Sequence, residues 1–317
     1  MYKLGIDLGG TNIAAGVVDE KFNIIGTASV KTNCPRPAEE IADDMKKAAL
    51  AAVKNAGVSL DDIESVGIGA PGSINNQDGT ISYSNNLGFY DVDLGKMMSE
   101  RLGRPVFLEN DANAAAYGEF LAGAGKGTKN FVAITLGTGV GSGIIVDGKI
   151  YSGHNFAGGE IGHTVIAMDG ECCTCGRNGC WEAYASATAL VRQTKQAMTR
   201  YPKTVMWKLC DGDINRVNGR TAFDAMRQGD EAGKFVVDKY INYIAVGISN
   251  VINIFQPEVL CIGGGISKEG KLLTDPINAF VSGEDYARTS DKRTVIKTAV
   301  LGNDAGIIGA AYLANLH

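Results

Sequence analysis

The sequence is poor in several features that mark particular classes of protein. No uninterrupted apolar run is long enough to span a bilayer, and Met1 to Asp7 reads as a strand rather than as a charged and then apolar leader. A formal net charge of −5 gives no basic surface of the kind that binds nucleic acid or anionic lipid. These absences predict a cytoplasmic protein that acts on small molecules, with neither nucleic acid nor a membrane as partner.

Proline is scarce and glycine is abundant, with 7 and 42 residues. The glycines fall mainly at the ends of short β-rich runs, where they let a ligand approach the backbone closely. Hydrophobic residues make up 45% of the chain and charged residues 21%, so we expect it to fold throughout. Its 317 residues fit two domains of about 150 residues each.

An internal repeat suggests that the two domains are copies of one another. Residues 4–18 and 133–146 each read as a strand, a glycine turn with a threonine, and a second strand, about 130 residues apart. Further strands are expected at 23–29, 64–70 and 106–109, and helices at 38–56, 94–102 and 231–255. Alternating strands and helices indicate a largely parallel α/β fold of two lobes with a cleft between them.

The expected lobes have definite bounds. A small N-terminal lobe covers residues 1–122 and is completed by a C-terminal helix at 305–317, and a larger lobe covers 123–304. Asp147-Gly148 is the expected turn of a hairpin. Residues 201–220 have no clear period and are expected to form a loop or short helices.

Two glycine-rich segments match nucleotide-binding patterns only in part. Residues 67–72 satisfy G-x-G-x-x-G, but Pro71 and the residues after it do not open a helix. Residues 123–127 resemble a P-loop, but the residue after Lys126 is glycine rather than Ser or Thr. We reject both as phosphate sites.

A better phosphate site follows the first strand. Asp7 ends this strand with a carboxylate able to hold hydrated magnesium, and the turn after it, Gly9, Gly10, Thr11 and Asn12, offers backbone N–H groups and small polar side chains to phosphate oxygens. A plain hairpin turn is the alternative. The second copy at Gly137, Thr138 and Gly139 favours phosphate binding, because a nucleotide between two lobes takes donors from both.

This pair of turns resembles the superfamily of actin, hexokinase and the seventy-kilodalton heat-shock ATPases. The resemblance implies a duplicated, ribonuclease H-like fold whose lobes bind ATP and magnesium. Gly264 and Gly265, in the glycine turn after the strand at 259–262, look like the adenosine motif of that superfamily.

Asp111 stands at the junction of a strand and an alanine-rich helix. One interpretation is a helix cap, because Asp and Asn are preferred there. The other is a general base that accepts the proton of an attacking hydroxyl, with Asn110 beside it. The spacing alone leaves both open.

Four of the seven cysteines lie within nine residues of one another, at 172, 173, 175 and 180, while Cys34, Cys210 and Cys261 are scattered and expected to be structural. Cys173, Cys175 and Cys180 with His163 have the number and softness that tetrahedral zinc requires. Gly176 and Gly179 permit the tight turns of a knuckle, and Cys172 is left over. The cluster predicts a structural zinc site.

The knuckle, together with Glu160-x-Gly162-His163, resembles the signature of the ROK family of repressors, open reading frames and sugar kinases. The two phosphate motifs, Asn110-Asp111, the knuckle and the glycine-rich segment 302–306 lie in the order of that family, so the resemblance covers the whole chain. One departure is Phe89, where the family usually has tryptophan.

The resemblance implies roles for particular residues. Asp111 would be the catalytic base, and the sugar would be bound by a set of polar and glycine residues: Gly72, Asn86, Asn110, Asp111, Glu160, His163 and Glu182. It also implies ATP, Mg²⁺ and structural Zn²⁺ as cofactors and a homodimer as the assembly. A site built to hydrogen-bond hydroxyls discriminates strongly against ligands that lack them.

The activity implied is ATP-dependent phosphorylation of a hexose, with glucose to glucose 6-phosphate favoured over fructose, mannose or N-acetylmannosamine. A sugar-responsive repressor of the family would carry a helix-turn-helix domain before the first phosphate motif. That motif begins at residue 7, so we expect no such domain. A sugar-binding protein without catalysis is disfavoured because Asp7 and Asp111 are both present.

Overall fold

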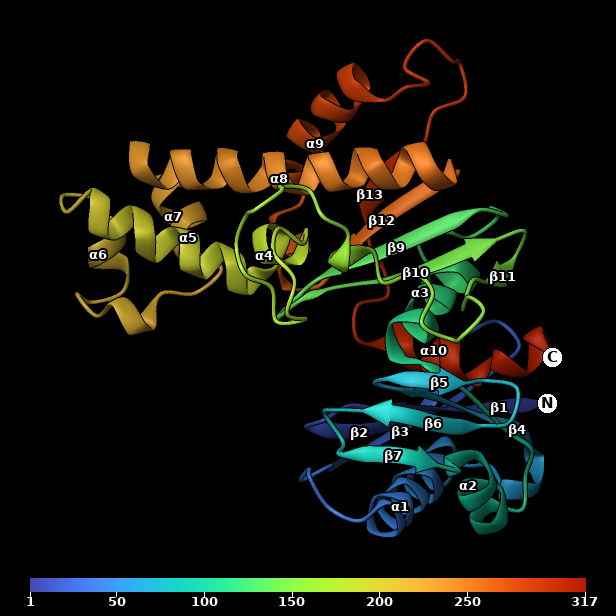
Figure 1. Cartoon of the computed structure of the whole chain (residues 1–317). Helices are drawn as coiled ribbons and strands as arrows, with labels where there is room; N and C mark the ends of the chain where they lie inside the picture. Colours follow the sequence, from blue (N-terminus) through green and yellow to red (C-terminus); the bar gives the residue numbers. More distant parts are fainter. The chain divides into compact units, whose positions relative to one another are not determined.

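The computed structural model describes all residues from 1 to 317, and the chain divides into two compact units (Figure 1). Unit 1 comprises residues 1–133, 142–159 and 299–317, and unit 2 comprises residues 134–141 and 160–298. No helix combines the length and the apolar character that crossing a membrane requires.

Unit 1 is built on a five-stranded sheet of order β3-β2-β1-β4-β8. Its strands are β1 (Tyr2–Leu8), β2 (Asn12–Val18), β3 (Ile24–Lys31), β4 (Ile63–Ala70) and β8 (Val106–Asn110). The first three form antiparallel pairs, whereas β1, β4 and β8 run parallel, with Asp7 opposite Gly69 and Gly69 opposite Glu109. The carboxyl ends of these three strands therefore meet at one edge of the sheet.

Helices cover both faces of this sheet. Figure 1 shows α1 (Ala38–Ala56) and α2 (Leu94–Leu102) on one side and α3 (Asp111–Ala122) and α10 (Asp304–Ala311) on the other. Glycines allow α10 to lie directly on the strands: Gly5 and Gly67 are register partners, and a Cβ on either would stand within 2 Å of a carbonyl oxygen of α10. The abundance of glycine is thus partly a packing requirement.

A smaller antiparallel sheet of unit 1 contains β5 (Ser73–Asn75), β6 (Thr80–Ser84) and β7 (Phe89–Val92). Phe89 is 3% exposed and belongs to the apolar core of the unit. The phenyl ring at this position therefore has a packing role.

The second five-stranded sheet has the order β11-β10-β9-β12-β13. Its strands are β9 (Phe131–Leu136), β10 (Val140–Val146), β11 (Lys149–Ile150), β12 (Val259–Gly263) and β13 (Val295–Thr298). Asp147 and Gly148 both have positive φ and form the expected hairpin turn between β10 and β11. The predicted repeat is confirmed, because β1–β2 and β9–β10 are each a strand, a glycine turn and a neighbouring strand.

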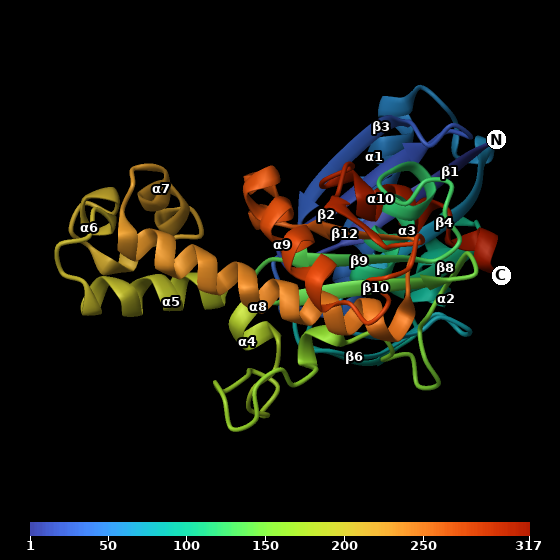
Figure 2. The ribbon, with the colours of Figure 1, turned by 90° about the horizontal axis from the view of Figure 1, so that it is seen from above.

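The helices of unit 2 are α4 (Glu182–Ala185), α5 (Ala187–Arg200), α6 (Met206–Leu209), α7 (Thr221–Arg227), α8 (Glu231–Phe255) and α9 (Lys271–Glu284). Five short 3₁₀ turns complete the chain: η1 (Leu60–Asp62), η2 (Ile161–His163), η3 (Ile214–Arg216), η4 (Gly265–Glu269) and η5 (Leu313–Leu316). Figures 1 and 2 both show α5 and α8 side by side, with α6 and α7 near one end of the pair. Residues 201–220 thus contain the expected short helices.

The bounds of the compact units differ from those expected for the lobes. Residues 123–133 and 142–159, expected in the second lobe, pack with unit 1, as do residues 299–304. The physical reason is visible at Gly143 of β10, where a Cβ would lie 2.3 Å from the Ala116 side chain of α3. Hairpin β10–β11 therefore packs directly against α3 at Gly143.

Candidate functional site

In unit 1, two carboxylates lie where parallel strands end. Asp7 is the next-to-last residue of β1, and Asp111 begins α3 directly after β8. Burial raises the pKa of Asp7 to about 6, and the charge of Asp111 adds to this effect. Burial also raises the pKa of Asp111, against hydrogen bonds from the backbone that lower it. The two groups form a desolvated acidic pair.

The cap of α3 is Asn110 rather than Asp111. The Asn110 side-chain oxygen accepts hydrogen bonds from the backbone N–H groups of Ala112 and Asn113, at 2.9 and 3.2 Å. Its amide nitrogen donates to the carbonyl oxygen of Gly72 at 3.1 Å. Asp111 is the first helical residue and accepts from the N–H of Ala112 at 2.8 Å. The cap interpretation of Asp111 therefore applies to its neighbour.

The other predicted residues of unit 1 lie near this edge. The first phosphate turn is closed by a hydrogen bond from Gly9 N–H to the carbonyl oxygen of Asn12. A Cβ on Gly10 would stand 3.7 Å from the Cβ of Asn86, so the first phosphate turn and the segment carrying Asn86 are neighbours. Gly10, Thr11, Asn12, Gly72 and Asn86 are all exposed. Gly306 of α10 packs against the Asp7 carboxylate, where a Cβ would stand 2.9 Å from Oδ2.

Glu109 is a buried residue of this region whose importance the sequence did not reveal. Its carboxylate is 3% exposed and accepts four hydrogen bonds. Oε1 accepts from Asn110 N–H at 2.8 Å and Asn113 Nδ2 at 3.0 Å, and Oε2 accepts from Asn76 Nδ2 at 2.8 Å and Ser152 Oγ at 3.1 Å. Four donors from three segments, the start of α3 and the segments that carry Asn76 and Ser152, hold the strand end that precedes Asp111. In the sequence, Glu109 looks only like the polar end of a strand.

In unit 2, the second phosphate turn joins β9 to β10 and is held against α5. The carbonyl oxygens of Gly137 and Thr138 accept hydrogen bonds from Ala187 N–H and Thr188 Oγ1, both at 2.8 Å. A Cβ on Gly264, which has a φ of 85°, would stand 2.4 Å from the carbonyl oxygen of Leu136. The predicted adenosine turn at Gly264 and Gly265 therefore lies beside the second phosphate turn.

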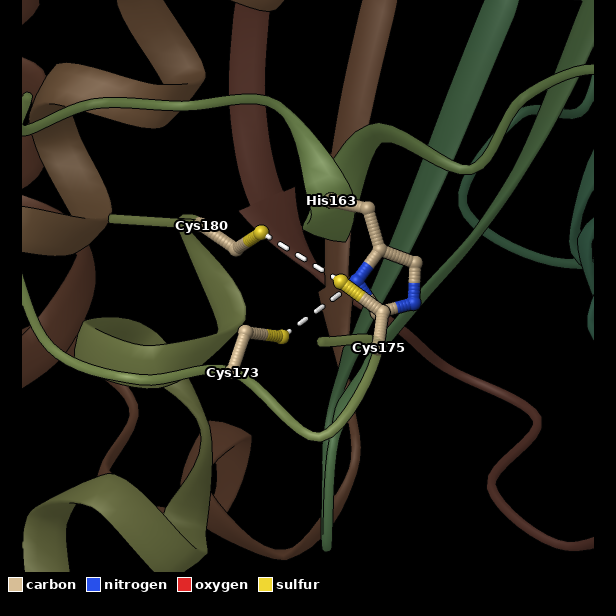
Figure 3. Close-up of side chains that lie close together, drawn as sticks. All are labelled: His163, Cys173, Cys175 and Cys180. Atoms are coloured by element: carbon tan, nitrogen blue, oxygen red, sulfur yellow. Dashed lines mark hydrogen bonds between the residues drawn. The ribbon is translucent and has the colours of Figure 1, made fainter. Parts of the chain in front are cut away.

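The four predicted metal ligands come together in unit 2 (Figure 3). One ligand atom from each of His163, Cys173, Cys175 and Cys180 lies within 4.8 Å of the others. The Cys173 sulfur is 3.6 Å from His163 Nδ1, and the Cys175 and Cys180 sulfurs are 3.7 Å apart. Tetrahedral zinc, with bonds of about 2.3 Å to sulfur and 2.0–2.1 Å to nitrogen, separates its ligands by roughly 3.6–3.8 Å. The donor set and its spacing fit zinc.

Packing holds this cluster in place. Trp181, directly after Cys180, is fully buried, and its indole N–H donates to the carbonyl oxygen of Tyr243 in α8 at 2.8 Å. A Cβ on Gly247 of α8 would stand 2.0 Å from that indole ring. His163 lies on η2, whose Gly162 rests against the carbonyl oxygen of Val140. Glu160 occupies the N-cap position of η2 without a side-chain hydrogen bond to it, and is exposed.

The remaining cysteines fall outside this cluster. Cys172 is exposed, Cys34 is half-buried, and Cys210 and Cys261 are buried at 2% and 1% exposure.

Comparison with known proteins places the chain within one family. The ROK family model matches residues 3–316. A glucokinase of Streptomyces coelicolor is 40% identical, over 98% of this chain and 96% of the relative. Both matches cover nearly the whole chain and therefore include residues of both compact units.

Solved structures agree with this match. The crystal structure of a ROK family glucokinase from Streptomyces griseus in complex with glucose and AMPPNP is 37% identical and superposes with a TM-score of 0.82, covering 100% of both chains. A ROK hexokinase from Thermus thermophilus is 32% identical with a TM-score of 0.81, over 100% of this chain and 98% of the other. These similarities confirm the predicted two-lobed fold of the actin and hexokinase type.

Proposed function

Because the chain belongs to the ROK family, we propose that it transfers the γ-phosphate of ATP to glucose, giving glucose 6-phosphate and ADP. The observation that carries this proposal is the position of Asp111 beside Asp7 at the carboxyl edge of the first sheet, with Asn110 serving as the helix cap. Because Asn110 caps the helix, the Asp111 carboxylate remains available as a general base.

Asp111 is assigned as the general base that accepts the proton of the attacking sugar hydroxyl. Phosphoryl transfer depends mainly on positioning and on neutralising charge, and a carboxylate within hydrogen-bond reach of the nucleophile assists the attack. Burial raises the pKa of Asp111, and a more basic carboxylate is a better proton acceptor once it is ionised.

ATP is proposed to be bound by the glycine turns that follow β1 and β9. Gly9, Gly10, Thr11 and Asn12 of the first turn, and Gly137, Thr138 and Gly139 of the second, would contact phosphate oxygens. Gly264 and Gly265 would lie against the adenosine. Asp7 would hold hydrated Mg²⁺, which suits an oxygen ligand and neutralises the phosphates.

The sugar is proposed to bind to amides, carboxylates and an imidazole, which belong to Asn86, Asn110, Glu160, His163 and Glu182. Gly72, which is hydrogen-bonded to Asn110, is proposed to line the same site. The support is chemical, since these groups match the donors and acceptors of a polyol. It is also geometric, since the hydrogen bond from Asn110 Nδ2 to the Gly72 carbonyl fixes the orientation of the Asn110 amide.

Zinc is proposed as the ion of the Cys₃His cluster, where it would brace the knuckle that carries Glu182. With Nδ1 facing the cysteines, Nε2 of His163 remains for another partner, such as a sugar hydroxyl. A homodimer, a cytoplasmic location and the absence of nucleic-acid and membrane partners belong to the proposal as expectations from the sequence.

Two alternatives follow from the sequence. The first is kinase activity toward fructose, mannose or N-acetylmannosamine, and the second is sugar binding without catalysis. The second is opposed by the partly buried pair of Asp7 and Asp111, because a protein that only binds sugar has no need of two carboxylates whose pKa values are raised by desolvation.

The experiment that tests the base compares Asp111→Asn with the wild type. We expect glucose-dependent ADP release in the wild type and a fall in kcat of about 10²–10⁴-fold in the variant, the usual contribution of a general base. The glucose Kd, measured by calorimetry, should change by only a few-fold because the amide still hydrogen-bonds a hydroxyl. A variant with near wild-type kcat would show that Asp111 is not the base.

A further inference from the structure

The carboxylate of Glu182 contacts both the metal cluster and the second phosphate turn. Its Oε2 accepts a hydrogen bond from the backbone N–H of Val140 at 3.0 Å. Its Oε1 accepts from Thr174 Oγ1 at 3.1 Å and lies 3.7 Å from the sulfur of Cys173. One side chain thus joins the knuckle to the first residue of β10.

The rest of the turn is held from the opposite end. Ala187 N–H and Thr188 Oγ1 of α5 bind the carbonyl oxygens of Gly137 and Thr138, and Gly137 N–H donates to the carbonyl oxygen of Gly139 at 3.0 Å. These contacts fix residues 137 and 138. The contact at Val140 N–H comes from Glu182 and fixes the point where the turn enters β10.

The glycine at position 139 is explained by the same carboxylate. A Cβ at this position would stand 2.2 Å from Glu182 Oε2, far inside van der Waals contact. Gly139 has no positive φ, so backbone conformation does not require glycine there. The close approach of Glu182 does.

We propose that Glu182 is a positioning residue for nucleotide binding, which orients the second phosphate turn and ties it to the metal cluster. This rests on the proposed function, in which that turn binds ATP phosphates. The role is additional to the sugar contact, because a carboxylate offers about four acceptor sites and can serve more than these partners. A preorganised turn binds phosphate more tightly, since ordering it on binding costs free energy.

Nucleotide affinity without sugar distinguishes this role from sugar binding. We would measure the Kd of AMPPNP by isothermal titration calorimetry, with Mg²⁺ and without hexose, for the wild type, Glu182→Ala and Glu182→Gln. Glu171→Ala is the matched control, because Glu171 lies on the same knuckle, is exposed and pairs with Arg192 at 3.7 Å. Bound zinc would be measured by mass spectrometry for each protein.

We expect Glu182→Ala to weaken AMPPNP binding about tenfold, because it leaves Val140 N–H without its charged acceptor. Glu182→Gln should stay within about threefold of the wild type, because its amide oxygen still accepts from Val140 N–H. Glu171→Ala should match the wild type. A Glu182→Ala variant with wild-type AMPPNP affinity, or a Gln variant as weak as the Ala variant, would overturn the positioning role.

A second variant decides the matter if Glu182→Ala does not fold or loses its zinc. Thr174→Val removes only the hydroxyl that donates to Glu182 Oε1, and should weaken AMPPNP binding about two- to fivefold. Unchanged affinity in that case would overturn the proposal. Failure of the wild type itself to bind AMPPNP would instead contradict the proposed function.

Discussion

At the scale of single residues, burial makes the acidic pair of unit 1 both costly and useful. Asp7 lies one residue before the end of β1, where burial and the charge of Asp111 disfavour its ionised form. A cation at this position would relieve the cost, which agrees with the proposed Mg²⁺ site. The two aspartates to which we assign function therefore reduce the stability of the protein when no ligand is bound.

Asp7→Asn is expected to stabilise the protein at neutral pH when no metal or nucleotide is bound. The pKa of Asp7 is about 6 in the fold against 3.8 for an aspartate free in water, so the folded state retains the proton longer than the unfolded chain. The free energy of unfolding of the wild type should therefore fall between about pH 4 and pH 6 and then level off, a loss of about 1–3 kcal/mol. The variant lacks this loss.

Urea unfolding at pH 4.5 and pH 7 measures the effect directly. Asp275→Asn is the control, because Asp275 is exposed on α9. The variant Asp7→Asn should be the more stable protein at pH 7 and should show a smaller dependence on pH. If the stabilities of the wild type and of Asp7→Asn depended equally on pH, the pKa of Asp7 would not be raised in the folded protein.

The roles of single residues could be predicted from the sequence only where they do not depend on contacts with distant residues. The spacing left Asp111 open as a helix cap or a general base, because both roles need only a carboxylate at the junction of strand and helix, and the structure gives the cap to Asn110. The contacts of Glu109 come from residues up to 43 positions away, so no local pattern could predict them. The clustering of His163 with Cys173, Cys175 and Cys180 was predictable, because donor chemistry, spacing and glycines coincide within residues 163–180.

At the scale of elements, close helix packing explains much of the glycine. Helices α3 and α10 cross at Gly118 and Gly309, where an added Cβ would stand about 2 Å or less from a backbone oxygen of the other helix. Backbones that approach this closely have no room for a side chain. The crossing positions Gly306 of α10 beside Asp7, at the site itself.

Gly309→Ala is therefore expected to destabilise the protein severely. Its Cβ would stand 1.7 Å from the carbonyl oxygen of Ala114, so the helices would have to separate. We expect a loss of more than about 3 kcal/mol, beyond the usual cost of overpacking. Thermal unfolding followed by circular dichroism measures it.

The control is Gly283→Ala in α9, where an added Cβ meets nothing within 4 Å. Alanine favours helix over glycine, so this variant should match or slightly exceed the wild type in stability, by up to about 1 kcal/mol. Equal stability of both variants would mean that α3 and α10 do not pack as described.

The knuckle has only a small apolar core of its own. The buried members of this core are Cys173, Cys180, Ala183 and Tyr184. Without a cation, burial and the neighbouring thiols raise the pKa of Cys180, so a bound metal has to displace protons from these sulfurs.

Metal analysis of protein purified without chelator is expected to find about one zinc per chain. Cys175→Ser should lower zinc content sharply, because the hydroxyl is a poor zinc ligand, while Cys172→Ser should leave it unchanged since Cys172 lies outside the cluster. A stable and active wild type without metal would contradict the zinc site.

At the scale of the whole molecule, duplication made the fold predictable. Two strand–turn–strand repeats in the right order predicted the two-lobed fold, which the solved relatives confirm at full coverage. The extent of the compact units was less predictable, because hairpin β10–β11 follows the second phosphate turn in sequence but packs on α3 through Gly143. The order of the elements in the sequence does not show that residues 142–159 pack with unit 1 again.

The choice of sugar depends on the whole set of proposed hexose ligands, which are spread along the chain from Gly72 to Glu182. Hydroxyl-binding groups reject a sugar whose hydroxyls point elsewhere, because buried donors and acceptors are left unpaired. We expect kcat/KM for glucose to exceed that for fructose, mannose and N-acetylmannosamine by at least about tenfold.

The most direct test of the proposed function is ADP release by the purified wild-type protein, with ATP and Mg²⁺, across these four sugars. We predict turnover that depends on the sugar and is fastest with glucose, with glucose 6-phosphate as the product. Equal rates with every hexose, or no ADP release with glucose, would contradict the proposed function.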